Sequence, residues 1–326
     1  MNNKRRFIFL HEKNMGLLQK AVIAAGVATA IGTAVTVCGP ALAQDKPVAP
    51  PGGATFTQEM SEQTKIYQTR SDVIPAGYVI DRSLLAYTIN LLPDFDHALA
   101  ELGPAQRWLD IGAGEGQAIL DYYGSRYDAM HQEGRVRRGS KARAVGISIE
   151  DRRKPVWHET AATLEPDKIR YLFGKTLSER APDELGKFNL ATDVFGGFSY
   201  TPRISRFMER TLSLLEVNGV FYTLLMDVHP ETWTKSSARP HTTFQTGIVN
   251  PDGSELKVCA WLKRIACVEV HCETDAKWDT PVERYRIRKT CNDVVVPALE
   301  SAHFVAGTPP ARQFRLVTPV GGTAAR

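Results

Sequence analysis

The stretch "RWLDIGAGEGQAIL", residues 107–120, decides how this chain folds. A hydrophobic run containing one acid is followed by three glycines at alternate positions and then by a segment with helical spacing. This order predicts a buried strand, a tight loop and the first turns of a helix. Glycine lets a ligand approach the main chain closely, and the start of a helix presents backbone N–H groups. The stretch therefore predicts a loop that binds an anion, a carboxylate or a cofactor carrying a nucleoside.

The same alternation of strands and helices continues around this stretch. Apolar spacings of three and four in residues 77–103 predict N-terminal helices. Short apolar runs predict strands at 142–149, 168–174, 188–196 and 220–228, and an amphipathic helix at 205–219 that ends at Asn218-Gly219. Short apolar strands that alternate with helices predict an α/β fold with a doubly wound, mostly parallel sheet. "ACVEVHC" (266–272) and "ARQFRLVTPV" (311–320) are the candidates for an antiparallel C-terminal edge.

The spacing of the three glycines does not match either of two common nucleotide-binding motifs. A dinucleotide fingerprint needs a third glycine where this chain has Gln117, and no Gly-Lys-Ser/Thr follows for a phosphate loop. "WLDIGAGEG" (108–116) instead resembles the first motif of the class I S-adenosylmethionine-dependent methyltransferases. "FNLATD" (188–193) and "LLEVNGVFYTLL" (214–225) resemble later motifs of that family in the same order. The resemblance covers about residues 84–228 and implies a Rossmann-like methyltransferase fold with S-adenosylmethionine as cofactor.

The resemblance also implies which residues hold the cofactor. The motif acid and the loop glycines would carry its methionine part: Asp110, Gly112, Gly114 and Gly116. Two positions depart from the family pattern. The slot for an acid that binds the ribose hydroxyls holds Ser148, with Glu150 two residues further on the same side of an extended strand. The slot for an acid that reaches the adenine amine holds Lys175, and a cation is a poor acceptor for an amine.

The stretch "DVFGGFSYT" (193–201) follows the fourth predicted strand and would line the ligand crevice. Asp193 is the candidate catalytic base, and Phe195, Phe198 and Tyr200 are candidates for the wall around an acceptor. The alternative is that Asp193 caps a turn and the aromatic residues belong to the core. His229 and Glu231, after the fifth strand, are secondary candidates.

Charge argues against a nucleic-acid substrate. The formal net charge of +4 comes from the first 43 residues, so the rest of the chain is neutral and offers no field to attract nucleic acid. The basic run 135–144, with Arg152, Arg153 and Lys154, is interpreted as a solvated loop. The Asn-Pro-Pro-Tyr/Phe signature of amino-methylating enzymes is also absent. The expected acceptor is a small molecule, a lipid or a protein.

The N-terminus has the order of a secretory signal. A basic start, an uncharged apolar run at 21–37 and small residues at 41–43 predict a signal peptide over residues 1–43, with Met15 as an alternative start. A Pro- and Gly-rich linker (44–76) and a methyltransferase-like domain (77–326) follow. We expect export to the periplasm or cell envelope; the alternative is an uncleaved segment that anchors the chain in the membrane. Export also favours a second function, an exported non-catalytic binding domain of the same fold.

Four cysteines lie beyond the predicted cleavage site: Cys259, Cys267, Cys272 and Cys291. An even number in an exported chain permits two disulfides, with three possible connectivities. The cysteine spacings match no common zinc pattern, so no metal site is predicted.

Overall fold

The computed structural model describes residues 82–124, 127, 141–201, 203–226, 247–249, 254, 256–275, 282–299, 302–305 and 313–316. The predicted signal peptide, the predicted linker, and the candidates His229 and Glu231 lie outside these residues and stay predictions. Within the described ranges, no helix has the length and apolar character that crossing a membrane requires.

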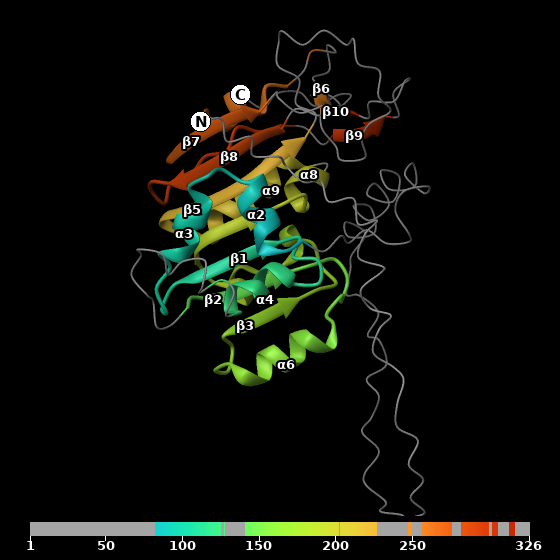
Figure 1. The fold of residues 1–326 in the computed structure, drawn as a ribbon. Helices are drawn as coiled ribbons and strands as arrows, with labels where there is room; N and C mark the ends of the chain where they lie inside the picture. Colours follow the sequence, from blue (N-terminus) through green and yellow to red (C-terminus); the bar gives the residue numbers. More distant parts are fainter. Residues whose placement is uncertain are drawn as a thin grey trace, which may run out of the picture. The chain divides into compact units, whose positions relative to one another are not determined.

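Seven strands of the described chain form one sheet in the order β3-β2-β1-β4-β5-β8-β7 (Figure 1). Their bounds are β1 Arg107–Ile111, β2 Arg143–Ile147, β3 Ile169–Leu172, β4 Phe188–Asp193, β5 Leu215–Met226, β7 Val268–Asp275 and β8 Val282–Lys289. The strands from β3 to β5 are parallel, whereas β8 runs antiparallel to β5 and β7. The strand order reverses between β1 and β4, so the predicted Rossmann-like, doubly wound sheet with an antiparallel edge is confirmed.

Helices cover both faces of this sheet over two hydrophobic clusters. The first cluster includes residues of α2 (Leu84–Asn90), α3 (Phe95–Ala100), α4 (Gln117–Tyr123) and α6 (Pro155–Thr163). The second includes residues of η2 (Leu177–Glu179), α7 (Pro182–Leu185), α8 (Gly197–Tyr200), α9 (Ile204–Leu214) and α10 (Val258–Leu262). Successive side chains of a strand point to opposite faces, so β1 contributes Trp108 to the first cluster and Leu109 to the second.

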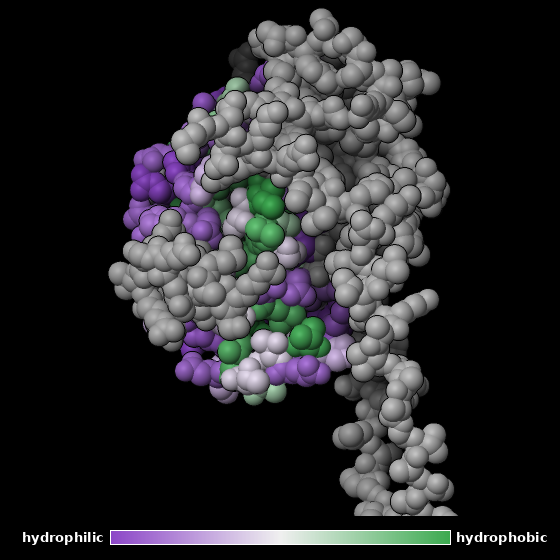
Figure 2. All heavy atoms as spheres, in the orientation of Figure 1, coloured by the Kyte–Doolittle hydropathy of each residue, from purple (hydrophilic) through white to green (hydrophobic). Residues whose placement is uncertain are grey.

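The predicted N-terminal helices are confirmed over the described residues as α2 and α3. The Ser83 hydroxyl caps α2 by accepting a hydrogen bond from the backbone N–H of Ala86 at 3.3 Å. Figure 2 shows hydrophobic surface over α2, where Leu85 is 49% exposed. The opposite side of α2 buries Leu84 and Tyr87, so this helix packs one face against the sheet.

The predicted end of the amphipathic helix is wrong. Helix α9 ends at Leu214, and β5 begins at the next residue. Asn218, with a φ of 69°, lies inside β5, where the pairing with β4 shifts register between Phe188 and Leu190. Asn-Gly therefore forms an irregularity in the strand instead of a helix end, because Asn tolerates the left-handed conformation in both settings.

The antiparallel edge is confirmed for only one of its two predicted strands. The stretch 266–272 contributes to β7, but 311–320 supplies β10 (Gln313–Leu316), which pairs with β6 (Gly247–Val249) and β9 (Ala302–Val305) in a separate sheet. The place beside β5 is taken by β8, "VERYRIRK". Its first four residues are all buried, including the charged Glu283 and Arg284, and burial alternates only in its second half.

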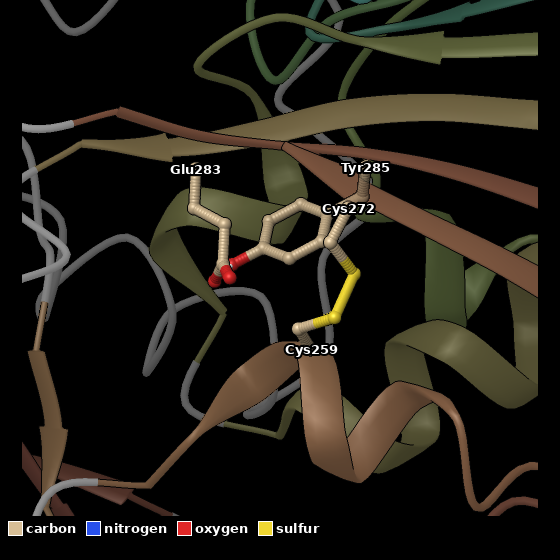
Figure 3. The surroundings of a disulfide bond; sticks show 4 residues. All are labelled: Cys259, Cys272, Glu283 and Tyr285. Carbon is tan, nitrogen blue, oxygen red and sulfur yellow. A yellow bond between two sulfur atoms is a disulfide. The ribbon is translucent and has the colours of Figure 1, made fainter. Parts of the chain in front are cut away.

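Two disulfides join the four cysteines of this edge. Cys259 in α10 bonds Cys272 in β7, and Cys267 bonds Cys291. Figure 3 shows the first bond beside Tyr285 and Glu283, whose side chains hydrogen-bond to each other. The first disulfide therefore ties helix α10 to the outermost strand of the sheet, and the second ties the start of β7 to the segment after β8.

The Cys259→Ala/Cys272→Ala double variant should be about 3 kcal/mol less stable to unfolding, because this bond closes a loop between residues 13 apart. Urea unfolding of the oxidised wild type and the double variant measures the difference. Maleimide labelling of unfolded, unreduced wild type should leave all four cysteines unmodified. Labelling of these thiols, or equal stabilities, would contradict the assigned bonds.

Candidate functional site

The glycine loop leaves β1 in a conformation that its three glycines share. Gly112, Gly114 and Gly116 have φ angles of 78°, 60° and 86°, in the left-handed region that side chains other than glycine rarely adopt. The backbone N–H groups of Gly112 and Ala113 both donate to the Ile147 carbonyl at the end of β2, each at 2.9 Å. The loop thus folds back over the neighbouring strand, and α4 begins directly after it at Gln117.

A second loop, after β4, packs main chain to main chain against the glycine loop. A Cβ added to Gly112 would lie 2.6 Å from the Cα of Gly196, and a Cβ added to Gly196 would lie 2.5 Å from the Ile111 carbonyl oxygen. Real Cβ atoms do not approach other atoms so closely, so both positions require glycine. The contact lies at the carboxyl ends of β1 and β4, where the strand order reverses and open α/β sheets bind ligands.

Aromatic side chains support the glycine loop from the α6 and β3 side. A Cβ on Gly116 would lie 2.4 Å from the ring of Trp157, which contacts Tyr171 edge to face at 5.3 Å between ring centroids. The Tyr171 hydroxyl donates to the Gly114 carbonyl at 2.5 Å. Burial raises the pKa of Tyr171 to about 12, so the phenol remains a donor at physiological pH. Trp157 and Tyr171 together hold the shape of the loop.

Asp110 is fully buried beneath the loop, in a network of hydroxyl groups. Its carboxylate accepts from the Tyr87 hydroxyl at 2.8 and 3.0 Å and from the Thr192 hydroxyl at 2.8 Å. The indole N–H of Trp108 donates to that Thr192 hydroxyl at 2.9 Å. Burial, followed by the charge of Asp110, raises the pKa of Tyr87 well above its usual value. The motif acid thus connects α2, β1 and β4.

Asp193 organises the loop after β4. It is fully buried, and its two carboxylate oxygens accept from the backbone N–H groups of Gly196 (2.8 Å) and Phe198 (2.9 Å). Burial raises the pKa of Asp193 to about 7, although these two hydrogen bonds act in the opposite direction. These contacts fit the interpretation that Asp193 caps a turn, and its role as a base stays a prediction.

Two of the three aromatic candidates of this loop, Phe195 and Phe198, have different surroundings, and the side chain of the third, Tyr200, lies outside the described part of the structure. Phe198 is 2% exposed and packs against Phe207, Phe221 and Tyr285, so it belongs to the core and does not line a crevice. Phe195 is partly buried and has a φ of 56°, which is rare for a bulky residue. The guanidinium of Arg82 lies over its ring, 4.7 Å from the centroid.

The positions predicted to bind ribose and adenine lie at the ends of β2 and β3. Ser148 is 4% exposed and acts to lower the pKa of Tyr171, against the larger effect of burial, so a hydroxyl stands where the family pattern has an acid. Glu150 is more exposed and forms an ion pair with Arg152 at 3.4 Å. Lys175 lies 4.0 Å from the carboxylate of Glu184. The charged groups at this end of the site are therefore engaged with one another.

Several residues of the site carry no local signal in the sequence. Tyr87, Arg82 and Thr192 lie in a helix, a segment before it and a strand, and only the fold brings them to Asp110 and the β4 loop. Trp157 and Tyr171 read as ordinary core residues. Thr192 faces the same side of the sheet as Asp110 because the two are register partners, and that register is known only from the structure.

The Asp193→Asn variant should lose a pH dependence that the wild type has. An acid whose pKa is about 7 when folded and about 4 when unfolded stabilises the fold below pH 4, and this contribution disappears as the pH rises through 7. The shift corresponds to about 4 kcal/mol. Urea unfolding of both proteins between pH 4 and 8 measures the two slopes. Parallel slopes would contradict the raised pKa.

Comparison with known proteins gives similarity of fold. No protein-family model matches the chain, and neither does any curated protein sequence. Many solved structures are similar in fold, and the three described below are each 14% identical or less. Geranyl diphosphate methyltransferase, in complex with GPP and sinefungin, is 14% identical over 41% of this chain and 44% of its own, with a TM-score of 0.30.

The other two structures cover more of this chain. Haemonchus contortus phosphoethanolamine N-methyltransferase 2, with phosphomonomethylethanolamine and S-adenosylhomocysteine, is 12% identical over 73% of this chain and 59% of its own (TM-score 0.41). The cyclase SpnF is 14% identical over 75% and 98% (TM-score 0.43). The chain thus spans less than two thirds of the geranyl diphosphate and phosphoethanolamine enzymes. At these values, the similarities add nothing to what the sheet order already establishes.

Proposed function

We propose that this chain binds S-adenosylmethionine at the glycine loop and transfers its methyl group to a small-molecule, lipid or protein acceptor. One observation carries the proposal. All three glycines of the G-x-G-x-G loop are left-handed, and Gly112 meets Gly196 main chain to main chain where the strand order reverses. This contact joins the carboxyl ends of β1 and β4 main chain to main chain, at the position where open α/β sheets bind their ligands.

The residues present fit the methionine half of this cofactor. Gly112, Gly114 and Gly116 would hold it, and the buried charge of Asp110 would attract its ammonium group. At the nucleoside end, Ser148 and Glu150 would bind the ribose hydroxyls, with Tyr171 beside Ser148. The Ser148 hydroxyl can accept and donate, so it complements a diol without a full negative charge.

The cofactor, when bound, supplies a methyl group already activated on a sulfonium. The chain has then to align the acceptor with that methyl and to exclude water. Asp193 is the proposed base for an acceptor that must lose a proton, and a pKa of about 7 suits that task. Its two hydrogen bonds to the backbone favour a second contribution, which is to fix the loop that carries Phe195.

The second candidate function is an exported binding domain that performs no chemistry. The observation in its favour is the absence of an acid from the ribose and adenine slots, where this chain has Ser148 and Lys175. A nicotinamide-dependent oxidoreductase is less well supported, because Gln117 stands where the dinucleotide fingerprint needs glycine.

Calorimetric titration of S-adenosylmethionine into the purified protein tests the proposal. We expect micromolar binding, and a loss of at least about tenfold in Asp110→Asn, which removes one buried charge while keeping the side-chain shape. The matched control is Asp121→Asn, which removes an acid of α4 that accepts from the backbone N–H of Leu84. Asp121→Asn should bind as the wild type does.

Two outcomes would count against the proposal. A folded wild type that binds no S-adenosylmethionine would leave the non-catalytic binding domain as the better function. Equal binding by wild type and Asp110→Asn would contradict the role of Asp110.

We also propose that the chain works outside the cytosol, in the periplasm or cell envelope. The two disulfides support this localisation, because such bonds persist in oxidising compartments and are rare in the cytosol. The predicted signal peptide supports it independently. An uncleaved N-terminal anchor is the alternative route to the same compartment.

Fractionation of cells that express a C-terminally tagged chain tests this localisation. We expect the tag in the envelope fraction, on a protein shortened to a start at Gln44. A full-length protein in the membrane fraction would identify the anchored form. A full-length cytosolic protein with reduced cysteines would contradict export.

A further inference from the structure

Phe195 occupies a strained position next to the glycine loop. Its φ of 56° is unfavourable for a residue with a large side chain, and such strain is commonly stored at functional sites. Hydrogen bonds from Gly196 and Phe198 to the Asp193 carboxylate hold the strained turn in place. Because Gly196 meets Gly112, this turn places Phe195 one residue from the contact with the glycine loop.

The ring of Phe195 has a hydrophobic side and a side that faces a cation. It packs against the cluster beneath α2 and α3, while the Arg82 guanidinium lies 4.7 Å from its centroid. A cation over an aromatic face is attracted by the negative face of the ring, and aromatic faces are used in this way to recognise onium ligands. The position thus suits a positive centre, and an arginine from the segment before α2 supplies one.

The surroundings favour a cation as well. Asp110 and Asp193 are both fully buried at the ends of β1 and β4, and the charge of Asp110 raises the pKa of Asp193. Arg82 has the opposite effect and lowers the pKa of Asp193 and of Tyr87. Two buried acids and one aromatic face therefore share Arg82 as a nearby positive charge.

We propose that the face of Phe195 is a binding site for the positive centre of an onium ligand, and that Arg82 covers this face when no ligand is bound. The proposal rests on the proposed function where the onium is the sulfonium of S-adenosylmethionine. An ammonium group on the acceptor has the same chemistry and is the second source. In either case Phe195 sets the preference for a charged ligand over its neutral counterpart.

The test compares ligands that differ in charge at one position. S-adenosylmethionine and sinefungin carry a positive centre there, and S-adenosylhomocysteine is neutral. In Phe195→Leu, which keeps an apolar side chain, the ratio of affinities for the charged and neutral ligands should fall about fivefold. In Arg82→Gln, which removes the competing charge, the same ratio should rise. Calorimetry with the full chain measures both ratios.

The proposal predicts that the ratio of affinities for charged and neutral ligands falls in Phe195→Leu and rises in Arg82→Gln. A purely structural contact between Arg82 and Phe195 would change all three affinities together and leave the ratios constant, which would overturn the sulfonium source. Should Phe195→Leu fail to fold, the fluorine probe described next decides the question.

A direct probe of the ring separates this inference from the proposed function. With 4-fluorophenylalanine incorporated in place of Phe195, tetramethylammonium chloride should shift the fluorine resonance saturably, and potassium chloride of equal ionic strength should not. A shift without any nucleoside binding would support the onium site while contradicting the proposed function. A shift together with constant ligand ratios would assign the site to an acceptor ammonium. The absence of a saturable shift would overturn the inference.

Discussion

The contact between Gly112 and Gly196 is the constraint on which the rest of the site depends. Two loops from adjacent parallel strands meet there without side chains, and a Cβ on either residue would collide with backbone atoms of the other loop or of β1. A main chain cannot move aside as the end of a flexible side chain can. The contact therefore fixes the two loops relative to each other, and with them the positions of Asp193, Phe195 and the left-handed glycines.

Beneath this contact, one buried carboxylate connects three elements. Asp110 is removed from water, which is costly for a charge unless polar groups surround it. Hydroxyls from α2 and β4 meet that requirement, and one of them also accepts from the Trp108 indole. Helix α2 is thus held to the sheet through Asp110. The family resemblance predicts that the same residue binds the cofactor. A change at Tyr87 would disturb both the helix and the crevice.

The sequence was informative where local chemistry decides the structure. Glycine spacing located the loop, and short apolar runs located β1 to β5, because strands buried on both faces must be continuously apolar. Local sequence patterns did not predict structure that depends on pairing between segments distant in sequence. Asn218-Gly219 suits a helix end and a strand irregularity equally, and only the pairing with β4 decides between them. Strand β8, between β5 and β7, has five charged residues among its eight, and its pairing with β5 cannot be predicted from its own residues. Tyr87, Arg82 and Tyr171 reach the site through tertiary contacts alone.

The connectivity of the two disulfides has a consequence for biogenesis. The pairs interleave along the chain, because Cys267 lies between Cys259 and Cys272 in sequence while its partner is Cys291. A chain oxidised in order, as it emerges from a membrane, would first join Cys259 to Cys267. The native pairs need β7 already aligned with α10 and β8, or a thiol exchange that corrects the first bond. The proposed export would therefore require either folding of this edge before oxidation or disulfide isomerisation after it.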